Sequence, residues 1–141
     1  MASLRLIVVF GIAMVLTIAT AEEKYTVERH TDVKNTCAKL LRTPTEDLEH
    51  YLASEYPEKH DTFCFVRCLY IIYGIYDDEH GVDLGKAFEM FGKGLSLDEF
   101  TEQSKVCFDH KEGEEEVSCH CKKAALPLLC LRNWYLENNR V

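Results

Sequence analysis

The sequence predicts an all-α protein of about six short helices, and three observations support this prediction. Apolar residues recur with helical spacing in successive segments of the chain. Capping residues, glycines or prolines mark the ends of most of these segments. No stretch of useful length alternates apolar and polar residues as a half-buried strand does, and no internal repeat is present.

The N-terminal residues have the composition of a secretory signal peptide. A single basic residue, Arg5, precedes an apolar run over residues 6–18, and the small residues Ala19 and Ala21 follow. This arrangement predicts a signal peptide over residues 1–21. The run is shorter than the roughly 20 apolar residues that a membrane-spanning helix needs. We therefore expect the mature protein, residues 22–141, to be a secreted, extracellular domain.

Two helices are expected in the first part of this domain. Helical spacing of apolar residues predicts the first over residues 33–41. The second is expected to begin with a capping box, in which Thr43 is the cap, Pro44 the first helical residue and Glu46 the returning acid. Pro57 should end that helix.

The third helix is expected over residues 63–75 and is apolar on nearly all sides. Asp61 can cap its start, and Gly74 lies near its end. A helix with so little polar surface lies in the centre of its fold, or has one side against a ligand. Cys64 and Cys68 are four residues apart and therefore face the same neighbours.

Two shorter helices are expected after a turn at residues 77–81. Asp83 can cap the first of them, and Gly92 can end it. Ser96 and Glu99 form a second predicted capping box, and its helix should continue to residue 108.

The last helix is expected after a charged loop at residues 111–116. Ser118 can cap this helix, which holds Trp134 and Tyr135 near its end. Pro127 should kink or interrupt it, because proline removes one hydrogen bond and clashes with the preceding turn.

The net charge is −8, or −9 once the signal peptide with Arg5 is removed, and this negative charge opposes binding to the phosphates of nucleic acid. Enzyme signatures are also missing. His60-Asp61 followed by Cys64 has some likeness to secreted calcium-dependent phospholipases, but their cysteine pair and glycine-rich calcium loop are absent. No zincin, hydrolase-elbow or P-loop motif is present. We expect no enzyme activity and no cofactor.

Two groups of residues have the composition of metal ligands. His60, Cys64 and Cys68 lie at successive four-residue intervals, and Cys119, His120 and Cys121 are adjacent. In an exported chain, thiols are more often found in disulfides than on zinc. We therefore expect no metal site. Six of the seven cysteines can pair in fifteen ways, and spacing alone does not choose among them.

The many aromatic side chains permit two interpretations. The chain has seven tyrosines, seven phenylalanines and one tryptophan. They can fill a solid core, which is the commoner role of any single aromatic residue. A small domain of short helices packs so many large side chains with difficulty, however, and stapled helices can instead enclose an apolar cavity.

The cysteine spacing resembles that of the insect odorant-binding proteins, the pheromone and general odorant-binding family. Six cysteines are separated by 26, 3, 38, 13 and 8 residues when Cys119 is left out. The text CFVRCLYIIYGIYDDEHGVDL around Cys64 is also similar to that family. The resemblance covers essentially the whole mature chain. It implies six helices around an apolar cavity, with the disulfides Cys37–Cys68, Cys64–Cys121 and Cys107–Cys130. Cys119 departs from the pattern and is expected to be the spare thiol.

This resemblance implies a carrier that reversibly binds a small apolar ligand, with a membrane receptor or a second copy of the chain as further partners to test. One alternative is a salivary scavenger of amines or lipid mediators of the kind found in blood-feeding insects, for which a buried carboxylate would favour an amine. Another is a secreted structural or signalling protein with a solid core. Helical-face reasoning selects these candidate lining residues: Phe65, Leu69, Ile72, Tyr73, Phe88, Phe91, Leu95, Leu128, Leu131, Trp134 and Tyr135.

Overall fold

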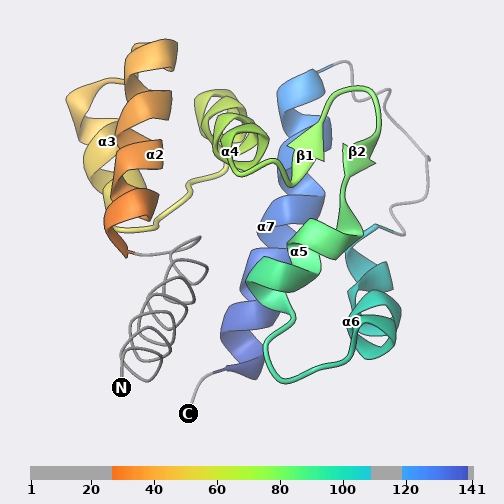
Figure 1. Ribbon diagram of the computed structural model, residues 1–141. Coiled ribbons are helices and arrows are strands. Elements are labelled where there is room, and N and C mark those ends of the chain that lie inside the picture. The colour runs from red at the N-terminus through yellow and green to blue at the C-terminus, as the bar shows by residue number, and fades with distance from the viewer. Residues whose placement is uncertain (1–26, 109–118, 140–141) are drawn as a thin grey trace, which may run out of the picture. The chain divides into compact units, whose positions relative to one another are not determined.

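The computed structural model describes residues 27–108 and 119–139, and six α-helices lie within these ranges (Figure 1). They are α2 (Val27–Leu41), α3 (Thr45–Leu52), α4 (His60–Ile72), α5 (Leu84–Phe91), α6 (Leu97–Ser104) and α7 (His120–Asn138). A 3₁₀ turn, η1 (Lys105–Cys107), and two strands, β1 (Tyr76–Asp77) and β2 (Gly81–Val82), complete the elements. The predicted all-α fold is confirmed. None of the described helices is long and apolar enough to cross a membrane. The predicted signal peptide lies outside the described residues.

The third predicted helix, α4, packs along α7, and the buried core lies between them. From α4, Phe65, Val66 and Leu69 are buried. From α7, two alanines, at 124 and 125, are buried ahead of two leucines, at 128 and 131. Small side chains at a helix interface let two backbones approach closely. Helix α7 also contacts α5, η1 and β2, so it connects most elements of the unit Thr31–Val141.

Two predicted caps hold as expected. The side chain of Asp83 accepts a hydrogen bond from the backbone N–H of Lys86 at 3.0 Å, and so caps α5. At the start of α6, Ser96 and Glu99 form a reciprocal capping box. Gly92 ends α5 as expected, but α6 stops at Ser104 and continues as η1 instead of running to residue 108.

The predicted capping box at Thr43 is wrong. The N–H of Thr43 bonds to the carbonyl of Ala38 at 2.9 Å, so Thr43 belongs to the closing turn of α2. Pro44 has extended backbone angles and its carbonyl accepts the first hydrogen bond of α3, from Leu48. Pro44 therefore occupies the cap position itself and not the first helical position, and no side chain caps α3.

Two further predicted caps are also wrong. Helix α4 begins at His60, because the carbonyl of Lys59 accepts the first hydrogen bond, from Phe63. Asp61 therefore lies inside the first turn, where its negative charge interacts favourably with the positive end of the helix dipole. Helix α7 has Cys119 at its cap position, and Ser118 lies outside the described residues.

Pro127 was expected to kink or interrupt the last helix, and the structure shows that it does not interrupt α7. Proline at this position leaves the carbonyl of Lys123 without its partner in the helix. Lys123 is exposed, so water can bind that carbonyl.

Helices α2, α3 and α4 each end in a residue of positive φ: Arg42 (53°), Ser54 (63°) and Gly74 (71°). The backbone hydrogen bonds around each of them are those of a Schellman turn. Gly74 was expected near the end of α4. For α3, the chain leaves the helix before Pro57, at Ser54.

The predicted turn at residues 77–81 is the tip of a short antiparallel hairpin, in which Tyr76 pairs with Val82. The Asp77 carboxylate accepts hydrogen bonds from the N–H groups of Glu79 and His80, at 2.9 and 2.7 Å. Arg67 of α4 forms an ion pair with Asp78 and so fastens the hairpin to α4.

Candidate functional site

Three disulfides hold α4 between other elements: Cys37–Cys68, Cys64–Cys121 and Cys107–Cys130. These are the pairs that the resemblance implied. The first joins α2 to α4, the second α4 to α7 and the third η1 to α7. The Cα atoms of Cys64 and Cys121 are 4.5 Å apart, so α4 and α7 are pinned closely at this point. The helices that these disulfides join cannot separate freely.

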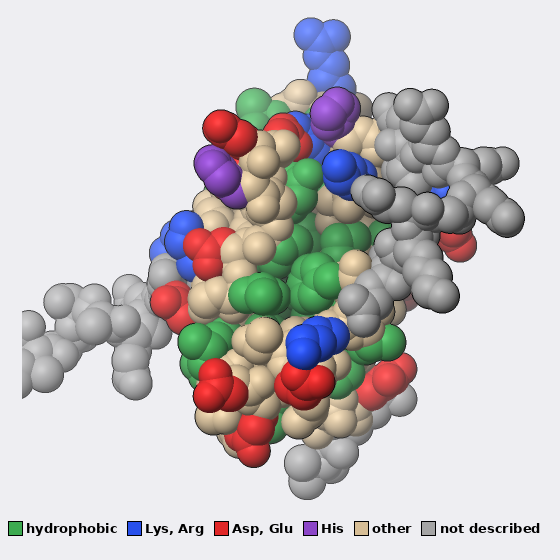
Figure 2. Space-filling model, turned by 90° about the vertical axis from the view of Figure 1, so that its right-hand side faces the viewer, with side chains coloured by type: hydrophobic (Ala, Val, Ile, Leu, Met, Phe, Trp, Pro, Cys, Tyr) green, Lys and Arg blue, Asp and Glu red, His purple; other side chains and the backbone are tan. Residues whose placement is uncertain are grey.

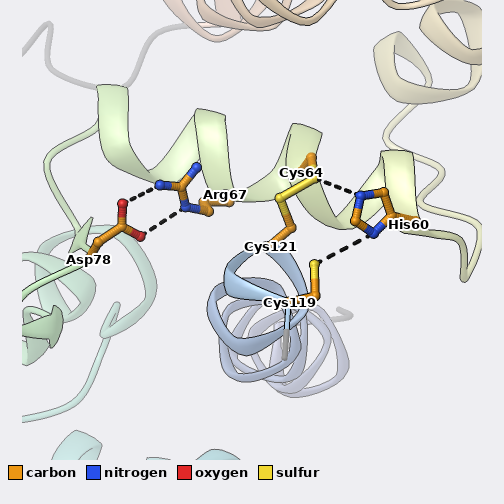
Figure 3. Close-up of a disulfide and its surroundings, with 6 residues drawn as sticks. All are labelled: His60, Cys64, Arg67, Asp78, Cys119 and Cys121. Carbon is orange, nitrogen blue, oxygen red and sulfur yellow. Dashed lines mark hydrogen bonds and ion pairs between the residues drawn. A yellow bond between two sulfur atoms is a disulfide. The ribbon is translucent and has the colours of Figure 1, made fainter. Parts of the chain in front are cut away.

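Cys119 is a free thiol beside the Cys64–Cys121 disulfide (Figure 3). Its sulfur lies 3.5 Å from Nδ1 of His60, and the other ring nitrogen of His60 lies 3.6 Å from the sulfur of Cys64. The two groups considered as metal ligands therefore lose most of their thiols to disulfides. Among the described residues, no group of three side chains could hold a metal ion.

One group of aromatic rings joins α4, α5 and α7. The ring of Phe91 lies between those of Tyr70 and Tyr135, with centroid distances of 6.2 and 5.9 Å. Tyr73 extends the row, 6.2 Å from Tyr70. The structure thus brings together Tyr73, Phe91 and Tyr135 of the predicted lining. It adds Tyr70, which the prediction missed although it lies one turn before Tyr73 on the same helix face.

A second group joins α5, α6 and α7. Phe100 of α6 is fully buried, and it lies 5.7 Å from the ring of Phe88 and 5.9 Å from that of Trp134. Phe88 and Trp134 are half-buried. Both were predicted lining residues, and the structure shows that Phe100 connects them.

The other predicted lining residues have different surroundings. Leu69, Leu128 and Leu131 are buried in the core, and Leu95 is half-buried in the loop before α6. Phe65 is buried against α3, where its ring stacks on Tyr51 with the centroids 4.1 Å apart. Ile72 is 38% exposed, at the end of α4.

One face of the molecule displays apolar side chains in its centre, with charged side chains around them (Figure 2). This is the right-hand side of Figure 1, where α6 and the β1–β2 hairpin are drawn. An apolar area rimmed by polar groups is typical of a ligand entrance or an interaction surface.

A polar group that the prediction missed lies where α2, the turn after α3 and α7 meet. Lys34 is only 2% exposed, and its amine donates to the Ser54 hydroxyl at 2.9 Å. Arg132 donates to the Ser54 carbonyl, also at 2.9 Å, and lies 5.0 Å from the ring centroid of Tyr56. Burial raises the pKa of the Tyr56 phenol. A signal was present in the sequence, since Lys34 precedes Cys37 and Ala38 by about one helical turn and so shares their inward face.

The chain is similar to known proteins over most of its length. The sequence model of the PBP/GOBP family matches residues 19–133. General odorant-binding protein 99b of Drosophila melanogaster is 28% identical over 117 residues, which are 80% of this chain and 78% of that protein. Odorant-binding protein 22 of Aedes aegypti is 24% identical over 112 residues, 77% of this chain and 80% of the relative.

Solved structures of Anopheles gambiae odorant-binding protein 22a have a similar fold. One is 31% identical and superposes with a TM-score of 0.63, over 74% of this chain and 98% of that one. Another contains the bound odorant cyclohexanone; it is 30% identical, has a TM-score of 0.62 and covers 77% and 96% of the two chains.

Proposed function

Because the chain belongs to the PBP/GOBP family, we propose that it is a secreted carrier that reversibly binds a small apolar molecule in an internal pocket. No bond is made or broken in this function. Affinity would come from burial of the ligand's apolar surface, with a few polar contacts that orient it. Relatives named as odorant-binding proteins support the proposal, as does the odorant bound to the Anopheles gambiae protein.

The observation that carries the proposal is the meeting of aromatic side chains from α4, α5, α6 and α7. Phe91, Tyr70 and Tyr135 form one group, and Phe100 joins two more rings in the other. Trp134 and Tyr135 are half-buried and adjacent on α7, so both groups have a member that a ligand can reach. Large aromatic surfaces with few polar groups are typical of small-molecule sites.

The alternative of an amine scavenger is less well supported by the charges of the site. A buried carboxylate would favour a cationic ligand. Among the described residues, no aspartate or glutamate is buried, and the buried charged side chain is a lysine, Lys34. The remaining alternative, a structural protein with a solid core, is separated from a carrier by the binding experiment below.

The test is the displacement of a fluorescent apolar probe from the delipidated mature protein. We expect Trp134→Ala and Tyr135→Ala to weaken probe binding by about tenfold or more, because each removes a large apolar contact worth at least about 1.4 kcal/mol. Leu40→Ala is the matched control, since Leu40 is exposed on α2. Helical circular dichroism would verify that each variant folds. Absence of probe binding to the wild-type protein at micromolar concentration would overturn the carrier function.

A second measurement identifies what the protein carries. Native mass spectrometry of the freshly purified protein should show a mass above that of the chain, which corresponds to a co-purified ligand. The same spectrum tests secretion, since a chain secreted by insect cells should begin at Glu22 if the signal peptide is removed as predicted.

A further inference from the structure

Lys34 is a buried cation without an acidic partner among the described residues. Its amine donates to the Ser54 hydroxyl at 2.9 Å and, more weakly, to the Leu52 carbonyl at 3.4 Å. An ammonium group has three donors, so one of them is not used by these two contacts. No described carboxylate lies within ion-pair distance of it. Burial and the neighbouring charge of Arg132 lower the pKa of Lys34 to about 8.

Arg132 of α7 brings a second positive charge to the same place. Its guanidinium donates to the Ser54 carbonyl at 2.9 Å and to the side-chain oxygen of Asn133 at 3.2 Å. The guanidinium has five N–H donors, so several are still available. No described acid pairs with Arg132 either. Two cations that share one serine repel each other, and an anion between them would remove that cost.

Tyr70 of α4 connects these cations with the proposed lining. Its side chain is only 6% exposed. None of the hydrogen bonds among the described residues involves its hydroxyl, and none affects its pKa. Tyr56 and Arg132 are close enough to affect the pKa of this phenol, which burial raises. On its other side, the ring of Tyr70 packs against Phe91, which in turn packs against Tyr135. Buried hydroxyl groups in native structures usually form a hydrogen bond, so the Tyr70 hydroxyl, which has no partner among the described residues, is able to bind a polar group of a ligand.

Lys34, Arg132 and Tyr70 have one property in common: each can donate hydrogen bonds. Lys34 and Arg132 offer only N–H groups, and the Tyr70 hydroxyl can also donate. A carboxylate has two oxygens that accept such bonds, and its negative charge would balance the positive charges of Lys34 and Arg132. An amine would add a third cation, and a ketone or ester would accept hydrogen bonds without neutralising the charge.

We propose that Lys34, Arg132 and Tyr70 form a subsite for the carboxylate of an apolar carboxylic acid, whose hydrocarbon chain lies along Phe91 and Tyr135. This proposal rests on the carrier function and specifies the class of its ligand. The charge of the whole protein opposes it, because a chain of net charge −8 repels an anion in solution. A preference for the acid must therefore come from local contacts.

The experiment compares decanoic acid with its methyl ester, by competition against a neutral fluorescent probe on the delipidated mature protein at neutral pH. The two ligands have the same chain and differ in the charge of the head group. We expect the acid to bind at least tenfold more tightly than the ester. Lys34→Met and Arg132→Met should each reduce this ratio several-fold and leave the affinity for the ester nearly unchanged. Tyr70→Phe should weaken acid binding by a smaller factor.

Lys39→Met is the matched control, because Lys39 lies on α2 and is exposed. It removes the same charge from the same helix without touching the subsite, so the ratio should stay at the wild-type value. Equal affinities for acid and ester in the wild-type protein would overturn the subsite and leave the carrier function intact. Failure of the probe and both ligands to bind would instead overturn the carrier function.

A measurement on the wild-type protein covers the case in which a variant does not fold. Decanoic acid labelled with ¹³C at its carboxyl carbon can be titrated in the complex by NMR. Beside two cations, the carboxyl pKa should fall well below that of the free acid. A bound carboxyl that titrates at or above its value in solution would contradict the subsite.

Discussion

The surroundings of Lys34 depend on one residue, Ser54, whose backbone has a positive φ of 63°. In this conformation, the Ser54 hydroxyl accepts from Lys34 while the Ser54 carbonyl accepts from Arg132. A non-glycine residue in this region of backbone space costs free energy, of the order of 1 kcal/mol. The contacts of both cations with Ser54 offset part of that cost.

At this scale, the pH dependence of stability tests whether Lys34 is buried as a cation. Because the folded-state pKa of about 8 lies below the ordinary 10.5, the unfolded chain binds more protons between these values. The free energy of unfolding should therefore rise with pH across this window, relative to that of Lys34→Met. Below the window, the difference between the two proteins should be constant.

Urea denaturation of both proteins at several pH values measures this difference. Both should also contain Cys119→Ser, since a thiolate would exchange with the disulfides at high pH. A difference that does not change with pH would mean that Lys34 has an ordinary pKa and is not buried.

The free thiol gives a second test at the residue scale. A thiol reagent should add one label to each native monomer, because Cys119 is partly exposed and the other described cysteines are in disulfides. Intact-protein mass spectrometry counts the labels, and Cys119→Ser should take none. A labelled Cys119→Ser monomer would show that one of the three disulfides is incomplete.

Among the elements, the start of α6 shows how much a cap contributes to a short helix. Helix α6 has eight residues, and its capping box satisfies two backbone groups that would otherwise need water. We expect Ser96→Ala to lower the free energy of unfolding by about 1 kcal/mol. Gln103→Ala, at an exposed site on the same helix, should change it by less than about 0.5 kcal/mol. Equal effects of the two substitutions in thermal unfolding would show that the cap contributes nothing.

For the whole molecule, the disulfides limit how far the helices can separate in the unfolded chain. Their loops differ in length, with sequence separations of 57 for Cys64–Cys121 and 23 for Cys107–Cys130. If chain entropy dominates, removal of the disulfide that closes the longer loop should lower the free energy of unfolding by about 0.8 kcal/mol more than removal of the one that closes the shorter loop. Double Cys→Ser variants at each pair, measured by urea denaturation, test this order. Cys119→Ser is the control and should leave the free energy of unfolding nearly unchanged. A larger loss for the Cys107–Cys130 variant than for the Cys64–Cys121 variant would show that native-state contacts, and not loop length, determine the loss of stability.

The elements that could be predicted from the sequence are those governed by local chemistry. Asp83 and Ser96 cap their helices because the groups that they bond lie within three residues of them. Thr43 was misassigned because its N–H is used by the preceding helix, at Ala38, and the local sequence did not reveal that competition. The two-residue strands at Tyr76 and Val82 are too short for any alternating pattern.

The candidate site was predictable only in part. Helical spacing placed Phe88, Phe91, Trp134 and Tyr135 in one predicted set. In the structure, Phe91 packs against Tyr135, whereas Phe88 and Trp134 both pack against Phe100. It placed Phe65 in the same set, although that ring stacks on Tyr51 of α3. Spacing gives the side of a helix on which a residue lies, but the neighbour on that side depends on how the helices pack.

The sequence by itself determined the helical class and the family, because periodicity, local caps and cysteine spacing are properties of the chain order. Only the tertiary structure brought Lys34 and Arg132 together at Ser54, since they come from α2, α7 and the turn after α3. It also brought Tyr70 of α4 close enough to Arg132 for the two to interact electrostatically. Their charges and hydrogen bonds act over a few ångströms in space, whereas Lys34 and Arg132 are nearly a hundred residues apart along the chain. The proposed ligand class follows from that spatial arrangement.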